Sequence, residues 1–314
     1  MGIKTFYCIL FGGIFGCLAQ ETTSLNPFFK TYDDKIIASL YYLEVSNNFQ
    51  IVNTNSDGSK TKLDLIPNRR EQIGIAASFK FADISFGFSP KVFDENKDNA
   101  NSKLFNISSR FIRNQWMQTI TFINQKGFYV SDGNLIIPFP DLRSTKIGGI
   151  SSYIFNPNFS FRTIANQKEW QTKSSGSFIP NFAFFYTNLD LNDNSLEPQS
   201  DVFEMTLAPS YYYNFVINHQ FLISTGVTIG AGISNIDGDI SAIYESSASL
   251  KLGYNSSSFF SFLNLNYIAF IQDESTKIGL NDNVSSLNFS VGYRFDPPKK
   301  VKEVFETINQ KTGL

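Results

Sequence analysis

The chain has 314 residues; 42% of them are hydrophobic and 16% aromatic, whereas only 17% are charged and the formal net charge is −2. A soluble protein of this length ordinarily carries more charge, and the sequence shows no basic tract that would bind nucleic acid. The chain after its N-terminal segment also lacks an apolar run of about 18 residues, the length that a membrane-spanning helix requires.

Residues 1–19 have the pattern of a cleaved secretory signal peptide. A single lysine, Lys4, precedes an apolar core that ends at Phe15, and the small-residue end Cys17-Leu18-Ala19 follows. Acylation of Cys17, as in a lipoprotein, is the disfavoured alternative because Phe15 fits that pattern poorly. Since Cys8 and Cys17 are the only cysteines, the mature chain has no thiol for a disulfide, a metal or a nucleophile.

An exported chain that is rich in aromatic residues, poor in charge and without spanning helices can still cross a membrane as a β-barrel. Residues 20–35 are expected to be an N-terminal extension. The first half of the chain then offers several strand candidates, some of them short, and a change of apolar phase near Asp83 predicts a tight turn or a β-bulge. The candidates are Ile36–Val45, Phe49–Asn53, Lys60–Ile66, Gln72–Phe81, Ile84–Phe88, Leu104–Phe111, Trp116–Ile123, Thr145–Phe155 and Phe159–Ala165.

The second half shows longer runs in which apolar and polar residues alternate, as a barrel strand requires when one face meets lipid and the other the lumen. In residues 217–233, Ile223 and Val227 have the apolar parity, whereas Ser224 and Thr228 have the polar one. Residues 239–254 repeat the pattern. A soluble β-sandwich also alternates, but runs of about 12 to 17 residues exceed its usual strand length and fit a tilted membrane crossing.

The last strand alternates from Leu287 to Phe295 and ends in "VGYRF". This ending resembles the signal that outer-membrane barrels present to the barrel assembly machinery, here with Tyr293 and Phe295 as its aromatic residues. Pro297 and Pro298 end the strand. Residues 296–314 are predicted to form a periplasmic C-terminal tail, with one short helix that presents Val301, Val304, Phe305 and Ile308 on one face.

Long and short connections alternate along the second half, and outer-membrane barrels keep their short turns on the periplasmic side. We therefore predict an all-β fold: a closed antiparallel transmembrane β-barrel of outer-membrane type over residues 36–295. About 12 strands are expected, within a range of 10 to 14 and in even number.

The middle of the chain carries a distinctive motif. Residues 159–162 read Phe-Ser-Phe-Arg, and residues 171–178 read Gln-Thr-Lys-Ser-Ser-Gly-Ser-Phe. With "NQKGFY" upstream and "VGYRF" at the end, they resemble the Bacteroidota exported-protein family catalogued as domain of unknown function 4421, in which a Phe-Ser-Tyr-Arg run precedes a Gln-x-Lys-Ser-x-Gly-Ser-Phe motif. Phe161 stands where tyrosine is usual. The resemblance covers most of the mature chain; it implies an outer-membrane barrel and supplies no activity, because the family is uncharacterised.

The polar stretch Gln167–Ser177 lies between two phenylalanine-rich runs and is the candidate functional segment. If the strand that contains Tyr186 continues backwards with the same parity, its polar residues share the lumen face. One hypothesis is a structural network of hydrogen bonds and ion pairs that fills the lumen; another is a pathway for a solute or ion, lined by Arg162 and Lys173. The candidate residues are Arg162, Glu169, Gln171, Lys173, Ser175, Ser177 and Asn181.

Two further points concern this stretch. A Ser-Lys catalytic dyad is disfavoured, because Lys173 and Ser174 are adjacent and would point to opposite faces of a strand. Counting strands back from the C-terminus puts the stretch near the periplasmic rim, and it also makes residues 125–144 a long periplasmic connection, which is unusual for this class.

Catalytic and metal chemistry find little support in the sequence. His219, the only histidine, has the lipid-facing parity beside a short connection, where a residue of the interfacial girdle is expected; a barrel lipid hydrolase is the distant alternative. The acidic segments "NSDGSK" and "NDNSLEPQSD" lack the full spacing of a calcium loop. We therefore expect no cofactor, metal or catalytic residue.

The predicted protein resides in the outer membrane and has a structural or narrow-pore role. The alternative is a diffusion channel or transporter for small polar solutes. Its expected partners are outer-membrane lipid, the barrel assembly machinery and, in the alternative, a small polar solute.

Overall fold

The computed structural model describes residues 26–312, apart from gaps at 33, 56, 68–69, 80–81, 89, 91, 94–102, 132–135, 166, 191–198 and 274–277. The predicted signal peptide, with Cys8 and Cys17, lies outside the described residues.

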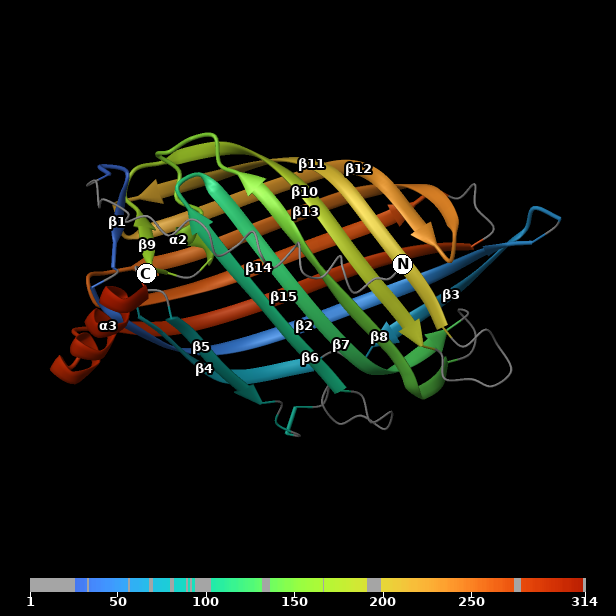
Figure 1. Cartoon of the computed structure of the whole chain (residues 1–314), viewed down its shortest axis with the longest axis horizontal. Coiled ribbons are helices and arrows are strands. Elements are labelled where there is room, and N and C mark those ends of the chain that lie inside the picture. The colour runs from blue at the N-terminus through green and yellow to red at the C-terminus, as the bar shows by residue number, and fades with distance from the viewer. Residues whose placement is uncertain are drawn as a thin grey trace.

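Strands make up most of the described chain (Figure 1). None of the helices described is long and apolar enough to span a membrane. The strands are β1 (Phe29–Thr31), β2 (Ile36–Thr54), β3 (Lys60–Pro67), β4 (Arg70–Phe79), β5 (Ala82–Phe88), β6 (Lys103–Arg113), β7 (Trp116–Ser131), β8 (Ile136–Tyr153), β9 (Glu169–Gln171), β10 (Ser175–Asp190), β11 (Gln199–Ile217), β12 (Phe221–Ile236), β13 (Asp239–Asn255), β14 (Phe259–Gln272) and β15 (Ile278–Phe295); the helices are α2 (Arg162–Ala165) and α3 (Lys299–Thr312).

One antiparallel sheet of 13 strands curls around a lumen and closes on itself. The closing contact joins the first and last long strands, since β15 pairs with β2 from Phe295 opposite Ile36 to Ile278 opposite Asn53. Strands β3 and β4 lie end to end along the other side of β2, so they fill one position in the wall. The wall therefore has 12 strand positions, and the closed barrel predicted from the sequence is confirmed.

The wall is continuous around the barrel through a short contact between β3 and β7, in which residues 64–67 pair with residues 128–131. Beside this contact, β5 extends the sheet from β4, and β6 extends it from β7. Among the described residues, β5 and β6 do not pair with each other. The hairpin of β4 and β5, with Phe79 opposite Ala82, is the turn that the phase change near Asp83 predicts.

The two ends of the barrel differ. At one end β2 begins, β15 ends and the turns are short; residues 154–174, between β8 and β10, also lie there. We name it the plug end and the opposite one the loop end. Tight turns at both ends use the positive φ angles that two-residue hairpins require: Asn218 (50°) and His219 (58°) between β11 and β12, and Asp237 (51°) and Gly238 (101°) between β12 and β13.

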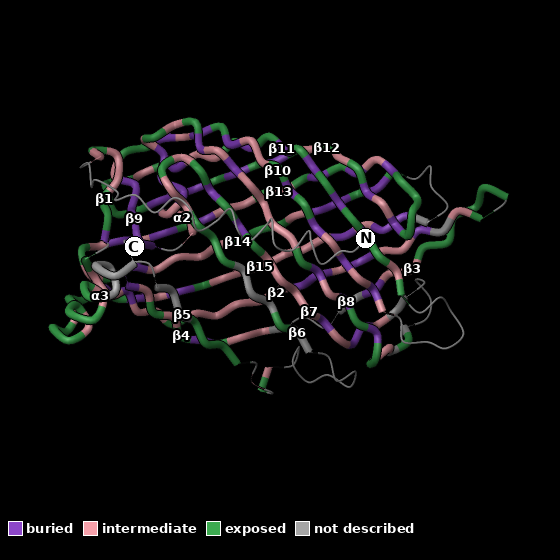
Figure 2. The backbone as a smooth tube through the Cα atoms, in the orientation of Figure 1, coloured by how far each residue is buried: buried purple, intermediate pink, exposed green. Residues whose placement is uncertain are grey.

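Burial alternates along the strands, as Figure 2 shows. In β12 Leu222, Ser224 and Thr228 are buried, whereas Ile223 and Val227 are exposed on the outside. The parity read from the sequence is therefore confirmed for this strand, and β11 and β13 follow the same rule. Large apolar side chains dominate the outer surface.

Aromatic side chains gather on the outer surface near the ends of the strands. Around the plug end Trp116 contacts Tyr153, and Phe221 contacts Tyr254, both with ring centres 5.1 Å apart. Near the loop end Tyr186 contacts Phe203. From Phe203 to Phe215 in β11, both exposed, the strand covers about 40 Å, or about 30 Å along the axis at a tilt of roughly 40°. This height matches the hydrocarbon core of a bilayer.

Large inward-facing side chains fill the space above glycines on neighbouring strands. A Cβ on Gly226 would collide with the ring of Tyr212, and one on Gly292 would collide with the ring of Phe260. These glycines let aromatic side chains lie flat against the wall and occupy the lumen.

The first half of the chain differs from the prediction in the extent of its strands. The segments Ile36–Val45 and Phe49–Asn53 belong to the single strand β2, and β8 begins at Ile136 instead of Thr145. Residues 125–144, which the sequence assigns to a long periplasmic connection, mostly continue β7 and β8 at the loop end. The physical reason is a β-bulge: Gly127, with φ 83°, shifts the register between Lys126 and Phe128, and the two strands go on pairing beyond it.

Candidate functional site

The connection between β8 and β10 folds into the plug end of the barrel. It contains α2 and β9, and β9 pairs with β1 of the N-terminal extension, with Phe29 opposite Gln171 and Thr31 opposite Glu169. We call residues 26–32 and 154–174 the plug. The sequence predicts a strand over Phe159–Ala165; this is wrong, because Ser160 caps a helical turn by accepting a hydrogen bond from the Thr163 amide (3.1 Å).

Apolar side chains anchor the plug to the inner wall. Trp170 and Tyr32 pack against Ile37, Leu222 and Phe260, which come from three wall strands. In a second cluster, Phe159, Phe161 and Ile154 of the plug pack against Met117 and Ile179 of the wall. Trp170 is 2% exposed and is the largest of the fully buried side chains among the described residues.

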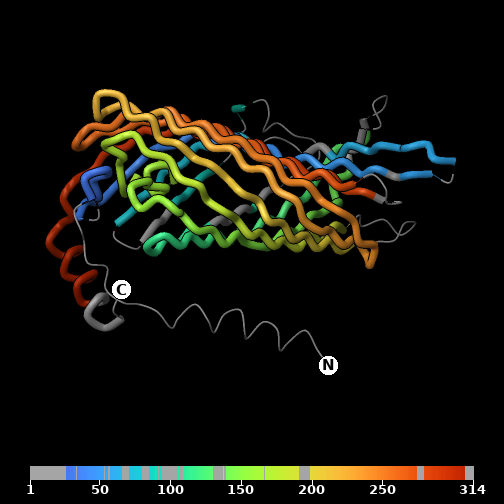
Figure 3. The backbone as a smooth tube through the Cα atoms, turned by 90° about the horizontal axis from the view of Figure 1, so that it is seen from above, coloured from blue at the N-terminus to red at the C-terminus, as the bar shows by residue number. Residues whose placement is uncertain are grey.

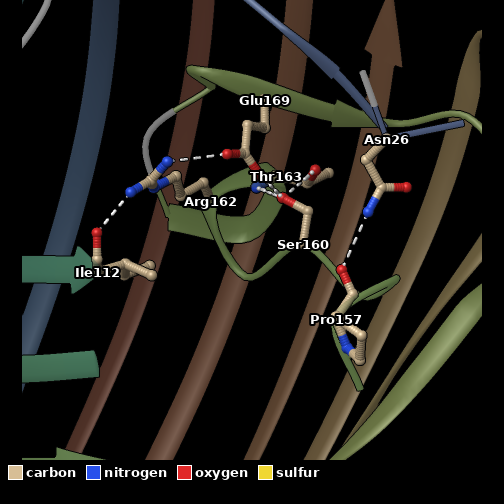
Figure 4. Close-up of polar contacts among 7 residues, drawn as sticks. All are labelled: Asn26, Ile112, Pro157, Ser160, Arg162, Thr163 and Glu169. Atoms are coloured by element: carbon tan, nitrogen blue, oxygen red, sulfur yellow. Dashed lines mark hydrogen bonds and ion pairs between the residues drawn. The ribbon is translucent and has the colours of Figure 1, made fainter. Parts of the chain in front are cut away.

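A group of polar side chains holds the plug together internally (Figure 4). Arg162 Nη1 donates to Glu169 Oε1 (3.0 Å), and Ser160 Oγ donates to the other carboxylate oxygen (2.5 Å). Arg162 also donates to the backbone carbonyl of Ile112 at the end of β6, and Asn26 Nδ2 donates to the carbonyl of Pro157 (3.1 Å). The carboxylate of Glu169 therefore links the helical turn to β9, and Arg162 links both to the wall.

Gln171 connects more segments than any of these residues. Its side-chain oxygen accepts from the Ser160 amide (2.9 Å) and from Asn214 Nδ2 (3.1 Å), while its Nε2 donates to the carbonyls of Phe28 and Asn158. Gln171 is fully buried. One side chain thus joins the N-terminal extension, two parts of the plug and β11.

Two buried cations of the wall bind the plug through its backbone. Lys251 Nζ in β13 donates to the carbonyls of Thr163 (2.8 Å) and Ile164 (3.0 Å). Arg294 Nη2 in β15 donates to the carbonyl of Gln167 (3.2 Å), and its guanidinium lies 3.8 Å from the ring centre of Tyr32. Among the described residues, neither cation has a carboxylate partner at ion-pair distance.

A second polar group lies in the middle of the lumen. Lys146 Nζ in β8 is 2.5 Å from Asp282 of β15 and 3.4 Å from Glu204 of β11, and all three side chains are buried. Strands β8 and β15 are on opposite sides of the barrel, so this ion pair crosses the lumen. Nearby, Thr206 Oγ1 donates to Glu245 (2.5 Å), and the rings of Phe185 and Phe270 lie 5.0 Å from Lys146 Nζ.

An apolar layer crosses the lumen at the loop end. It is formed by side chains from eight strands that meet in one buried cluster: Phe49, Leu65, Phe128, Leu142, Leu189, Val202, Ile236 and Leu280. We call Lys146, Glu204 and Asp282 the Lys146 group. From one end to the other, the described lumen is therefore filled by the apolar layer, by the Lys146 group and by the plug.

The structure places most of the sequence-predicted site residues inside the barrel. Arg162, Glu169 and Gln171 belong to the plug as described above. Ser175 and Ser177, at the start of β10, accept hydrogen bonds from Asn156 (both 3.0 Å), and Asn181 donates to Ser210. Whether these residues act as a structural network or as a pathway stays a prediction.

Lys173 does not lie in the lumen. It is exposed at the rim of the plug end, with Nζ 5.4 Å from the ring centre of Phe28. The sequence argument extends the parity of β10 back through Lys173, and this part of it is wrong because residues 172–174 bend between β9 and β10. Parity is not preserved across such a bend.

Three other residues singled out from the sequence lie on the surface of the plug end. His219 is exposed in the turn between β11 and β12, with Nδ1 3.0 Å from the carbonyl of Thr172. Tyr293 and Phe295 are exposed on the outer face of β15. Their role as an assembly signal stays a prediction.

The sequence argument missed the charged groups of the lumen: Lys146, Glu204, Asp282, Lys251 and Arg294. A signal for them exists, since Glu204, Lys251 and Arg294 each occupy the polar parity of an otherwise alternating strand. A charge at that parity, within a strand long enough to cross a membrane, has to find a partner in the lumen.

Comparison with solved structures returns outer-membrane barrels at low identity. The outer membrane protease OmpT from Escherichia coli has a TM-score of 0.43 and 9% identity, and the alignment covers 88% of this chain and 100% of that one. A structure described as a bacterial polysaccharide outer membrane secretin has a TM-score of 0.41 and 10% identity, with coverage of 82% and 98%. For OprG from Pseudomonas aeruginosa the TM-score is 0.26 and the identity 11%, with coverage of 85% and 98%. No curated protein matches the sequence.

A family model gives the more specific result. The model described as "Domain of unknown function (DUF4421)" matches residues 26–295, which include the plug and all 12 positions of the wall. The protein therefore belongs to the family of domain of unknown function 4421.

Proposed function

We propose that the protein is an outer-membrane barrel that is closed by its own plug and has a structural role. The observation that carries this proposal is the filling of the described lumen at three levels: the loop-end apolar layer, the Lys146 group and the plug. A water-filled channel would need a continuous polar path, and a layer that combines Phe49, Phe128 and Leu280 interrupts any such path.

The proposed location is the outer membrane, with the plug end in the periplasm. The apolar outer surface, the aromatic side chains near both strand ends and their spacing of about 30 Å support a membrane location. The short turns at the plug end support the orientation. In this location outer-membrane lipid surrounds the wall, and the barrel assembly machinery is the expected partner for insertion.

Fractionation and gel mobility test the location. The mature protein should sediment with outer membranes and should migrate faster on a gel before boiling, because a closed barrel resists detergent. Recovery from the soluble periplasm would contradict the proposal.

Conductance tests the closed lumen. Purified protein in a planar bilayer should produce no steady conductance steps at moderate voltage, because the apolar layer excludes hydrated ions. Stable openings of the wild-type protein would rule out the structural role in favour of a diffusion channel.

A second candidate function is transport of a small polar solute after both the plug and the loop-end apolar layer move. The observation that favours it is the attachment of the plug by hydrogen bonds from Lys251 and Arg294 to backbone carbonyls, which can open without breaking a covalent bond. Displacement of the plug would leave both cations facing the lumen. Liposome swelling with neutral and anionic sugars distinguishes the candidates: no uptake is expected from a structural barrel, whereas uptake that favours the anion is expected from the transporter.

An enzymatic role is not part of this proposal. Its test is hydrolysis of phospholipid in mixed micelles by the wild-type protein and by the His219→Ala variant. Turnover that disappears in the variant would establish a lipid hydrolase and contradict the proposal.

A further inference from the structure

Helix α3 follows the last barrel strand and is amphipathic. Asp296, Pro297 and Pro298 separate it from Phe295, and its first turn begins with the hydrogen bond from the Val301 amide to the Pro298 carbonyl (2.9 Å). Along the helix Val301, Val304 and Phe305 recur at the spacing of one helical face. The barrel needs no such helix to close its wall, so the amphipathic face calls for a separate explanation.

The surroundings of α3 place it beside the rim of the wall. Lys35 Nζ binds Asp296 Oδ1 (2.5 Å), which ties the linker to the start of β2. Phe305 contacts Phe79 at the end of β4, with ring centres 4.8 Å apart in an edge-to-face arrangement. In Figure 3 the helix lies at the plug end and runs across the long direction of the barrel instead of along it. Its axis is therefore parallel to the membrane that the barrel would span.

Both faces of α3 have exposed side chains, which are apolar on one face and charged on the other. Val304 is 56% exposed although it lies on the apolar face. The polar residues Lys299, Lys300, Lys302, Glu303 and Glu306 are exposed as well. The contact with Phe79 therefore leaves part of the apolar face uncovered, whereas the polar face meets solvent.

The wall next to α3 continues this apolar surface. An outer groove of about 560 Å³ lies between β2, β4, β5, β14 and β15 near the plug end. Its lining includes Leu40, Ile75, Phe86, Phe259, Val291 and Tyr293. Phe259 and Tyr293 are exposed on the outer face at that end of the barrel, where aromatic side chains of outer-membrane barrels meet the headgroups.

We propose that α3 lies flat in the headgroup layer of the leaflet at the plug end, with Phe305 against Phe79 of the wall and with Val301 and Val304 toward the acyl chains. The inference rests on the membrane location proposed above. Helices of this kind bury their apolar face at the boundary of headgroups and acyl chains and keep lysines at the phosphates. Lipid is the occupant because the exposed apolar face adjoins the apolar outer wall, because the helix axis is parallel to the membrane plane, and because three lysines lie in its first turns.

Site-specific fluorescence tests the proposal. The mature chain contains no cysteine, so Val304→Cys and Glu306→Cys each provide one labelling site, on opposite faces of α3. Each variant is made as the mature chain, without residues 1–19 and so without Cys8 and Cys17. It is labelled with bimane and reconstituted in phosphatidylcholine vesicles whose acyl chains are brominated either near the ester groups or near the methyl ends. Val227→Cys, at an outer-wall position that is 59% exposed, serves as the control for membrane insertion.

The expected result is at least about twofold stronger quenching of the residue 304 label than of the residue 306 label by lipid brominated near the ester groups. The residue 227 label should respond most to lipid brominated near the methyl ends. If residue 227 is quenched while residues 304 and 306 remain equally accessible to aqueous iodide, the inference is wrong and the membrane location stands. If residue 304 is shielded from both bromine and iodide, protein covers the helix and lipid does not. Absence of quenching at residue 227 would contradict the proposed location and the inference together.

Discussion

Truncation of Trp170 should detach the plug while the wall stays intact. Trp170 is 2% exposed and packs between Tyr32, Leu222 and Phe260, and its indole nitrogen donates to the carbonyl of His219 (3.0 Å). Replacement of a buried tryptophan by alanine costs about 3–5 kcal/mol, because apolar contacts are lost and a cavity remains. At about 1.4 kcal/mol per factor of ten, Trp170→Ala should raise the equilibrium constant for plug opening by about 10² to about 4 × 10³.

Hydrogen exchange measures this change directly. The Tyr32 amide donates to Lys168 and the Thr172 amide to Phe28, so both should lose protection by about the same factor in Trp170→Ala. Trp116→Ala is the matched control, because Trp116 is 56% exposed on the outer wall and surface substitutions usually change stability by less than about 0.5 kcal/mol. Unchanged protection of the plug amides in Trp170→Ala would refute the idea that packing of this side chain holds the plug. If the loop-end apolar layer closes the lumen independently, the variant should remain without conductance.

Three further predictions concern the wall, the lumen and α3. Ile229→Arg puts a charge on the outer face in the middle of β12, where residue 229 is 71% exposed. It should lower the free energy of unfolding in vesicles by about 2–4 kcal/mol, whereas Ile240→Arg near the loop end should lower it by at most about 1 kcal/mol. Equal losses would mean that the outer face does not meet lipid. Lys146→Met leaves Asp282 and Glu204 buried without a cation, so denaturant titration should show a free energy of unfolding lower by about 3–5 kcal/mol. The double variant Lys146→Met/Asp282→Asn should recover part of this loss. If it recovers none of it, these side chains are not coupled. The hydrogen bond to Asp296 raises the pKa of Lys35 above its ordinary value, so its stabilising effect is complete below that ordinary value and is lost as the pH rises through the raised pKa. Quenching of a bimane label already attached at Val304→Cys, by lipid brominated near the ester groups, should therefore be constant across neutral pH and should fall in strong alkali. A transition at acidic pH would instead identify loss of the Asp296 charge.

The sequence predicts the wall well because the relevant signal is local. Alternation with period two decides which face each residue occupies, and in β12 this reading holds from Leu222 to Thr228. The same local rule fails where the chain leaves the sheet, as at Lys173, because a bend of three residues resets the parity. The extent of β7 and β8 escapes prediction for a related reason: the bulge at Gly127 shifts the apparent phase.

The plug and the lumen charges depend on distant partners. Phe161 packs on Ile179 and Met117, and Lys146 finds Asp282 at a separation of 136 residues. Which inward-facing residues meet across a lumen depends on the number, the stagger and the tilt of the strands together. Parity can therefore show that Lys251 and Arg294 point inward, but it cannot show that the backbone carbonyls of the plug receive them.

The pairing of β1 with β9 also constrains the order in which the chain assembles. Strand β1 lies inside the plug end, and β2, which follows it within a few residues, forms the closing seam with β15. Once this seam has formed, the N-terminal segment can reach β9 only through the end of the barrel. We therefore expect β9 to capture β1 while the seam is still open, and the pairing of the two chain ends, which has the longest sequence separation and the largest entropic cost of closure, to come last. The plug would then hold the first strand in register while the last one arrives.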